Sequence, residues 1–375
     1  MLLGCDSENE REILVKRIAE MNMITRSSYY HHSRYKIFQR VASCVVLALL
    51  IIACGNSEVT VIPPTPTVIT ADDVANRSRI VYAKTFDRLG GEFDLYTMKP
   101  DGSDQQQLTS EPGLEISPEW SPDGKTLAFA STRDSRQPNN CVRGNVERNC
   151  NYEIYTIQAD GTNLRRITNL TSLDRDPSWS PDGKRLAWTT TPFPSYKAEL
   201  AIIDVDGSNM QILTDDPGYH EAHPEWSPDG TQIVWTRFDG QRYDLYTIQM
   251  DDYAIKQVMI DHSIVDDVGN ANATWSPDGN YLAWIVMSGD PKSPATSLGI
   301  MNADGTNQQV FNVNPAMSYG YVPSWSPDGQ HLVYIHQADG SYSMYKVNRD
   351  GTNVTQLSDG QAYYSVPAWS PILEP

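Results

Sequence analysis

One pentapeptide, Trp-Ser-Pro-Asp-Gly, recurs along the chain and limits its possible folds more than any other feature. Complete copies begin at five tryptophans and a truncated Trp-Ser-Pro begins at a sixth: Trp120, Trp179, Trp226, Trp275, Trp325 and Trp369. The intervals between them are 59, 47, 49, 50 and 44 residues. A second aromatic residue lies nine positions after the tryptophan of each complete copy, so the repeat uses all 9 tryptophans of the chain. A repeat of this length predicts units that bury their apolar surface against their neighbours.

Each interval contains four short strand-like runs. After Trp120, the turn Ser121-Pro122-Asp123-Gly124 has proline at its second position and glycine at its fourth, as a type I turn favours. Two apolar runs follow, at 126–130 and 153–157, and Asp160-Gly161 then predicts a hairpin before a fourth run at 164–168. The repeat therefore predicts four-stranded antiparallel sheets.

The two ends of the array indicate how it closes. The first unit, from Arg79, starts at its second strand, Ile80–Ala83, whereas no second strand follows Trp369. A C-terminal strand around Val366–Trp369 is therefore free to complete the first unit and remove its exposed edge. We predict an all-β fold, a six-bladed β-propeller over residues 79–371, with the first blade closed by the C-terminal strand.

These Pro-x-Trp-Ser-Pro-Asp-Gly repeats resemble the TolB-type β-propeller over about four fifths of the chain. Such blades are specific for the fold and weakly informative about function, because the same fold carries many functions. The resemblance is to the blades alone: the 24 residues of 55–78 leave no room for the α/β domain that precedes the propeller in TolB. We therefore expect a TolB-like protein that is not TolB itself.

The N-terminal part of the chain has the features of a lipoprotein leader. The apolar run Val41–Ala53 is shorter than the roughly 20 residues that span a membrane, follows basic residues and ends in Ile51-Ile52-Ala53-Cys54, which resembles the bacterial lipobox. We predict a signal peptide at 23–54 with Cys54 as the lipid-attachment site; residues 1–22 are an extended or spurious N-terminus. The Pro/Thr-rich residues 55–78 are interpreted as a linker.

The chain is expected to lie outside the cytoplasm, attached by its lipid to a bacterial membrane. In that compartment Cys141 and Cys150 most simply form a disulfide, since two thiols alone are too few ligands for structural zinc. They fall in the longest interval between repeats, which holds about 11 more residues than the mean of the others.

Charge and missing motifs exclude several functions. The formal net charge of -18 opposes binding to nucleic acid. No Gly-x-Ser-x-Gly elbow, phosphate loop, dinucleotide fingerprint or Cys/His dyad is present, so the sequence points to a binding module rather than an enzyme, with no cofactor.

Candidate ligand-binding residues are expected at the mouth of the central channel, on the face of the variable loops rather than that of the uniform turns. The fifth and third positions before each tryptophan, with neighbouring tyrosines, give one acidic or amide arc and one aromatic arc. The candidate residues are Glu115, Asp174, Asp176, Glu221, His223, Asn270, Asn272, Tyr319, Tyr321 and Tyr364.

His220 and His223 form the only histidine cluster after the leader, so a divalent cation there is a weaker alternative. Oligogalacturonate lyases, which resemble this chain in their propeller, hold a metal in such a site. The leading interpretation is a membrane-anchored module that binds a protein or a glycan of the cell envelope. The alternatives are a propeller lyase acting on acidic oligosaccharides, with its metal near these histidines, and a structural envelope protein.

Overall fold

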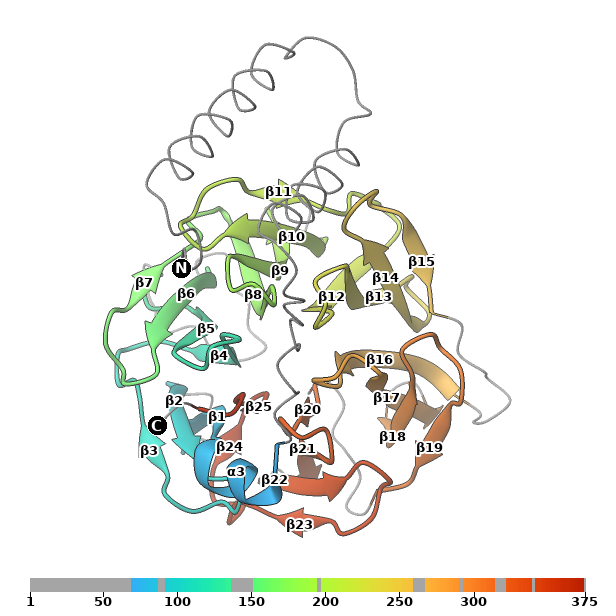
Figure 1. Cartoon of the computed structure of the whole chain (residues 1–375). Helices are drawn as coiled ribbons and strands as arrows, with labels where there is room; N and C mark the ends of the chain where they lie inside the picture. The colour runs from blue at the N-terminus through green and yellow to red at the C-terminus, as the bar shows by residue number, and fades with distance from the viewer. Residues whose placement is uncertain are drawn as a thin grey trace, which may run out of the picture. The chain divides into compact units, whose positions relative to one another are not determined.

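The computed structural model describes residues 69–86, 92–135, 151–193, 197–258, 267–290, 293–313, 322–338 and 341–373. The described part is almost entirely β-strand, and Figure 1 shows its sheets arranged radially around a central axis. Each sheet contains four consecutive strands or is completed by strands from the C-terminus. The all-β prediction is confirmed.

The sheets are named here by the tryptophan that ends their first strand. The Trp120 sheet contains β4 (Glu115–Trp120), β5 (Thr126–Ser131), β6 (Glu153–Gln158) and β7 (Arg165–Arg166). The Trp179 sheet contains β8 (Ser172–Trp179), β9 (Arg185–Pro192), β10 (Glu199–Asp204) and β11 (Gln211–Ile212). The Trp226 sheet contains β12 (His220–Trp226), β13 (Gln232–Phe238), β14 (Tyr243–Gln249) and β15 (Ile255–Gln257).

The remaining strands follow the same pattern. The Trp275 sheet contains β16 (Asp267–Trp275), β17 (Tyr281–Asp290), β18 (Ser293–Asn302) and β19 (Gln309–Phe311). The Trp325 sheet contains β20 (Ser324–Trp325), β21 (His331–Ala338), β22 (Ser341–Asn348) and β23 (Thr355–Gln356). A single parallel pair, Tyr243 with Gly269, joins the Trp226 and Trp275 sheets into one eight-stranded sheet.

The closing sheet combines both ends of the described chain. It contains β1 (Ile80–Thr85), β2 (Asp94–Met98), β3 (Gln106–Gln107), β24 (Tyr363–Tyr364) and β25 (Ala368–Trp369). Both C-terminal strands pair antiparallel with β1: Ile80 faces Trp369, and Lys84 faces Tyr364. The N-terminal strand of the array therefore has its partner at the other end of the sequence.

The recurrent turns have one hydrogen-bond pattern. In the first copy, the Ser121 hydroxyl donates to Asp123 Oδ1 over 2.7 Å, and the Gly124 N–H donates to the Ser121 carbonyl over 2.8 Å. Gly124 has φ +66°, a conformation that glycine adopts without strain. The same serine-to-aspartate bond recurs in the other complete copies, so the pentapeptide is a structural turn.

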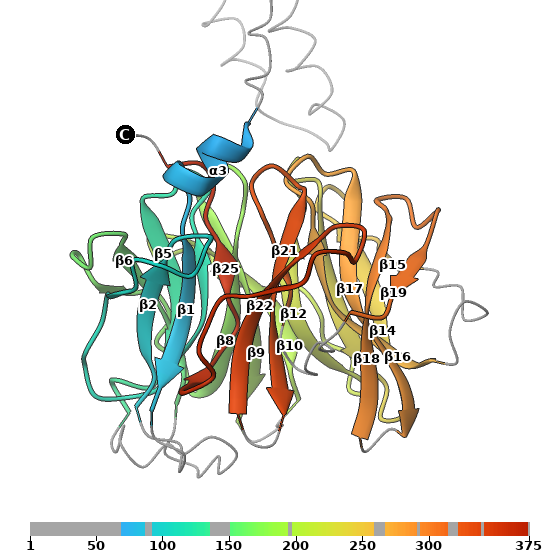
Figure 2. The same ribbon diagram turned by 90° about the horizontal axis from the view of Figure 1, so that it is seen from below.

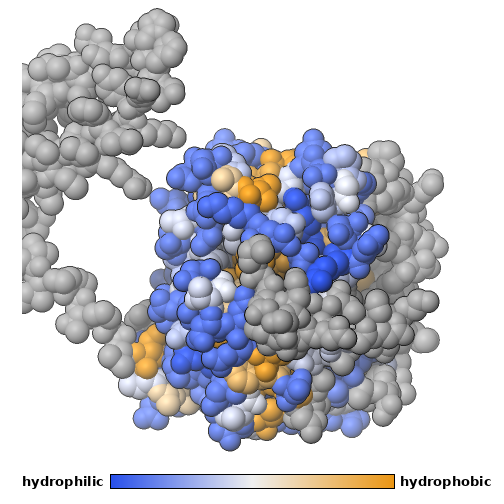
Figure 3. Space-filling model, turned by 90° about the vertical axis from the view of Figure 1, so that its right-hand side faces the viewer, coloured by the Kyte–Doolittle hydropathy of each residue, from blue (hydrophilic) through white to orange (hydrophobic). Residues whose placement is uncertain are grey.

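The core lies between the sheets. The second aromatic of each repeat is at most 1% exposed: Phe129, Trp188, Trp235, Trp284 and Tyr334. Each of these residues belongs to a hydrophobic cluster that combines side chains from two adjacent sheets. One cluster joins Val333 and Met344 of the Trp325 sheet to Ile80 and Tyr82 of the closing sheet. Each sheet is therefore stabilised by its neighbours. On the side shown in Figure 3 the described surface is mainly hydrophilic, with small hydrophobic patches.

A short helix lies inside the segment interpreted as a linker. The helix α3 (Ala71–Arg77) begins with a capping box, in which Thr70 Oγ1 accepts the Asp73 N–H and the Asp73 carboxylate accepts the Thr70 N–H. Val74 is buried in the cluster between the Trp325 and closing sheets. Figure 2 shows α3 across one end of the propeller. The last residues of this segment therefore form ordered structure, which composition did not predict. Among the described residues, no helix has the length and apolarity needed to cross a membrane.

Candidate functional site

A recurring irregularity in the first strand of four sheets builds the candidate site. The register of β4, β8, β12 and β16 shifts just before the tryptophan, which marks a β-bulge. The third residue before each tryptophan has a positive φ, between 50° and 57°: Ser117, Asp176, His223 and Asn272. The equivalent residues of the last two repeats are Val322 and Val366, and a β-branched residue is unfavourable in this conformation. The bulge therefore changes the direction of the polar side chains at this position in four neighbouring sheets.

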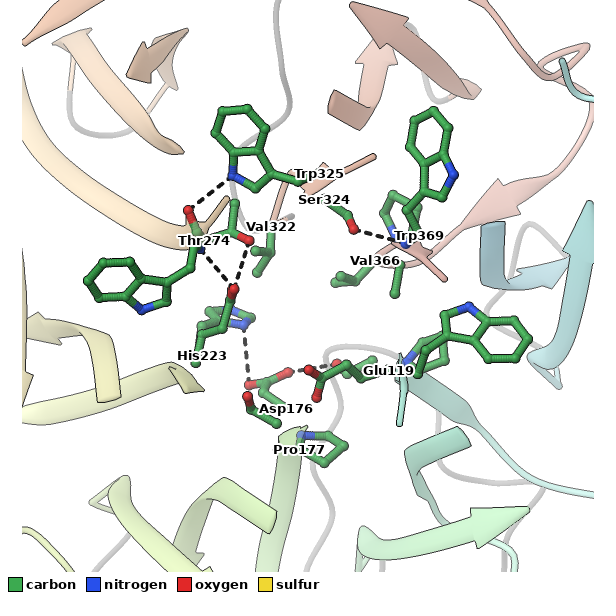
Figure 4. A pocket seen from close by; sticks show the side chains of 18 of the residues that line it. Glu119, Asp176, Pro177, His223, Thr274, Val322, Ser324, Trp325, Val366 and Trp369 are labelled. Atoms are coloured by element: carbon green, nitrogen blue, oxygen red, sulfur yellow. Dashed lines mark hydrogen bonds and ion pairs between the residues drawn. The ribbon is translucent and has the colours of Figure 1, made fainter. Parts of the chain in front are cut away.

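A cavity of about 250 Å³, here called the central pocket, lies on the axis where these strands meet. Residues from all the tryptophan repeats line it, and Figure 4 shows Asp176, Glu119 and His223 on one side and Val322 and Val366 on the other. The prolines of several Trp-Ser-Pro turns also line the cavity, so it extends toward the face of the uniform turns, where we did not expect ligand-binding residues.

Three repeats contribute a chain of polar contacts to the central pocket. The Ser117 hydroxyl donates to Asp176 Oδ1 over 2.6 Å, and His223 Nδ1 lies 3.6 Å from Asp176 Oδ2. Asp176 and His223 are 15% and 19% exposed, so both keep a face toward the cavity. This order places the carboxylate between the hydroxyl and the imidazole, which is not the order of a hydrolytic triad, where the histidine lies between them.

The residue directly before each tryptophan connects neighbouring sheets at the axis. Glu119 accepts the Trp179 N–H and Glu225 accepts the Trp275 N–H, both over 2.9 Å. Ser178 and Ser324 accept the N–H of the next tryptophan in the same way. Sequence reasoning missed these residues. The sequence does contain a pattern that indicates them: the position before the tryptophan holds a hydrogen-bond acceptor in every repeat except the last, where it is Ala368.

The two pocket glutamates, Glu119 and Glu225, have raised pKa values. Burial raises the pKa of Glu225 to about 8, although hydrogen bonds from Trp275 and Thr274 act in the opposite direction. Burial raises the pKa of Glu119 well above its usual value, and the nearby charge of Glu225 raises it further. Glu225 is therefore largely protonated near neutral pH unless a cation enters the pocket.

The structure divides the predicted site residues into two groups. Asp176 and His223 reach the central pocket together with Ser117, whereas the residues two positions earlier are enclosed between sheets. Glu115 bonds to Thr109 and Arg133, Asp174 to Ser172 and Thr190, Glu221 to Arg237 and Trp235, and Asn270 to Trp284. Tyr364 is 1% exposed and lies in the core of the closing sheet. The channel-mouth prediction placed this second group at the surface, but strand alternation and the bulge turn it inward.

Other predicted residues lack a structural test. Cys54, Cys141, Cys150, Tyr319 and Tyr321 lie outside the described residues. His220 is exposed and His223 is partly buried, and no group of three or more His, Cys, Asp or Glu side chains suited to a metal ion occurs within the part of the chain that the structure describes.

The radial sheets, the shared interfaces and the axial pocket define the class of protein: a β-propeller built from Trp-Ser-Pro-Asp-Gly repeats. Residues 195–373 match the family model described as TolB beta propeller domain. TolB from Acinetobacter baumannii has a similar structure, with a TM-score of 0.65 and 23% identity over 78% of this chain and 67% of that one. A putative TolB from Agrobacterium tumefaciens gives a TM-score of 0.53 and 18% identity over 79% of this chain and 99% of that one.

Curated relatives match over shorter stretches. The Tol-Pal system protein TolB of Anaeromyxobacter dehalogenans is 28% identical over 127 residues, which are 34% of this chain and 25% of that protein. An uncharacterized protein of Agrobacterium fabrum is 28% identical over 134 residues, 33% of this chain and 39% of that protein. The chain thus spans between a quarter and two fifths of the length of these relatives. Its propeller fold is similar to that of TolB, and the low identity fits a protein distinct from TolB itself.

Proposed function

We propose that this chain is a non-catalytic, extracytoplasmic binding module whose central pocket receives one basic side chain of a protein partner in the cell envelope. One observation carries the proposal: Glu119, Asp176 and Glu225, from three successive sheets, line the same cavity of about 250 Å³. A lysine or arginine side chain would pair with these carboxyl groups, and the valines opposite would contact its aliphatic stem. The description of one relative as a Tol-Pal system protein supports an envelope partner.

The proposal gives a role to the two glutamates with raised pKa values in the pocket. A cation lowers the pKa of a carboxyl group close to it, so entry of a basic side chain would displace protons from Glu119 and Glu225. Binding would therefore strengthen as pH rises toward about 8, the pKa of Glu225 in the free protein. Above that pH the binding affinity would rise no further, because Glu225 is already ionised in the free protein.

The test uses N-acetyl-lysine amide and N-acetyl-arginine amide as probes, with N-acetyl-norleucine amide as the uncharged control. We expect calorimetry to give a dissociation constant of about 1 mM for the better cation, in the range of small-ligand efficiencies. Asp176→Asn should weaken it about tenfold or more, whereas Asp160→Asn, an equal loss of charge in an exposed turn, should not. Equal binding of the norleucine control, or no effect of Asp176→Asn, would reject the proposal.

We further propose six blades in a ring closed without a covalent bond, and a lipid anchor at Cys54. The pairing of β24 and β25 with β1 and the cluster shared by the Trp325 and closing sheets support the closure. The lipobox-like sequence supports the anchor. A Cys54→Ser variant that stays in the membrane fraction would reject the anchor. The predicted Cys141–Cys150 disulfide stays a prediction, checked by thiol titration of the exported protein.

A further inference from the structure

A second cavity, here called the lateral pocket, lies beside the axis and has a different chemistry. It measures about 440 Å³ and is formed mainly by β8, β12, β13, β14 and β16, which Figure 1 shows around one part of the ring. The pairs His220 with Phe238 and Phe238 with Tyr243 place it at the end of the strands opposite the Trp-Ser-Pro turns. This is the face on which the sequence favoured ligand binding.

Two hydrogen-bond donors in the lateral pocket have no acceptor. Asn272 is 3% exposed, and its side-chain Nδ2 is buried without a partner, although its backbone N–H donates to Thr236 Oγ1 over 2.8 Å. Arg175 Nε is also buried without a partner, and the residues that the structure describes offer Arg175 no ion pair. A buried donor without an acceptor is costly, so two in one cavity indicate a missing group.

The surrounding charges favour an anion in spite of the acidic character of the chain. Glu221 lines the same pocket, but its oxygens accept from Arg237 over 2.6 Å and from Trp235 over 2.6 Å, so its charge is compensated. Asp176 bonds to Ser117 and faces the central pocket instead. Arg175 therefore supplies a positive charge that no carboxylate in the lateral pocket neutralises.

An apolar wall lies close to the donors. The Phe238 and Tyr243 rings stack with their centroids 4.3 Å apart, and both line the cavity. The geometry points to a site for a small carboxylate ligand, with its anionic group on Arg175 and Asn272 and its body against the aromatic pair. Arginine suits this task because its planar guanidinium matches a carboxylate. This inference concerns another pocket and does not depend on the proposed function.

The experiment uses three probes in calorimetric titrations of the whole protein. D-Glucuronate represents a sugar acid, N-acetyl-glutamate amide represents a carboxylate presented by a peptide, and D-glucose is the neutral control. We expect at least one carboxylate to bind about tenfold or more tightly than D-glucose, since a charge-assisted hydrogen bond is lost with the charge. The tighter of the two carboxylates identifies the source of the ligand.

Two variants and a control test the assignment of residues. Arg175→Gln keeps much of the side chain but removes the charge, and Asn272→Asp replaces a donor by a carboxylate, so both should weaken carboxylate binding about tenfold or more. Arg165→Gln removes an equal charge on an exposed outer strand and should leave binding unchanged. If Asn272→Asp lowers the melting temperature, its effect on binding cannot be separated from misfolding. The affinity of Arg175→Gln then tests the assignment alone. Unchanged affinity of Arg175→Gln, or no carboxylate binding at the highest soluble concentration, would overturn the inference.

Discussion

At the scale of single residues, the position of a polar side chain relative to the bulge decides its role. Glu221 and His223 are two residues apart on β12, yet Glu221 is 1% exposed and paired with Arg237, whereas His223 faces the central pocket. Residues two positions apart on a strand normally point to the same face. The bulge between Ala222 and Glu225 breaks that rule, and only the structure reveals it.

This division predicts that Glu221 stabilises the fold and does not bind ligand. Glu221→Gln leaves the buried Arg237 guanidinium without its counter-charge, so we expect the free energy of unfolding to fall by about 3 kcal/mol or more. Chemical denaturation measures this loss. The matched variant Asp160→Asn, which alters an exposed turn, should change the free energy of unfolding far less. Equal stability of the two variants would contradict the assignment.

At the scale of elements, turns and strands were predictable from the sequence, whereas the exact site was not. The pentapeptide fixes each turn through local bonds such as Ser121 to Asp123, so its meaning can be read without tertiary structure. The interaction of Glu119 with the Trp179 N–H joins residues 60 positions apart, and no local pattern specifies such a contact. The helix α3 was missed because its burial depends on the cluster that Val74 joins, and its preceding segment is rich in proline.

The closing strands give a prediction at this scale. Truncation after Tyr364 removes β25 and Trp369, whose Nε1 donates to Ser78 over 2.9 Å, and leaves β1 without part of its partner. We expect a large loss of thermal stability and a tendency to aggregate, because an unpaired strand edge is a site of association. Differential scanning calorimetry and light scattering measure both effects.

Truncation after Leu373 is the matched control for the closing strands. It preserves the Leu373 N–H bond to the Arg77 carbonyl and the Leu373 carbonyl bond to the Arg77 side chain. The melting temperature should therefore match that of the full chain. A stable, monomeric protein ending at Tyr364 would show that the ring does not need its C-terminal strands.

At the scale of the whole molecule, buried carboxyl groups occur in facing pairs across successive sheet junctions. Burial is the largest cause of the raised pKa of each shifted member, and in three junctions the opposite carboxylate raises the pKa of one partner further: Asp94 acts on Glu115, Asp174 on Glu153, and Glu221 on Glu199. The pKa reaches about 6 for Asp94, about 7 for Glu115 and Glu199, and about 8 for Glu225.

These raised values determine how stability should depend on pH. A carboxyl group whose pKa is higher in the folded state binds more protons there than in the unfolded chain, so its contribution is complete below the unfolded value of about 4 and is lost as pH rises through the folded value. The turn aspartates act in the opposite sense: hydrogen bonds from Ser121 and Thr162 lower the pKa of Asp123 and Asp160, so their contribution is lost only in stronger acid. Maximum stability should therefore lie near pH 4, at the unfolded pKa that separates the two groups.

The measurement is the melting temperature between pH 3 and pH 9 at constant ionic strength. We expect a maximum near pH 4 and a steady decrease up to about pH 8, where Glu225 ionises. The variant Glu225→Gln keeps an oxygen to accept the Trp275 N–H but cannot ionise, so its curve should fall less between pH 7 and pH 9. A melting temperature that rises from pH 5 to pH 8 in the unmodified protein would contradict the placement of protonated carboxyl groups inside the propeller.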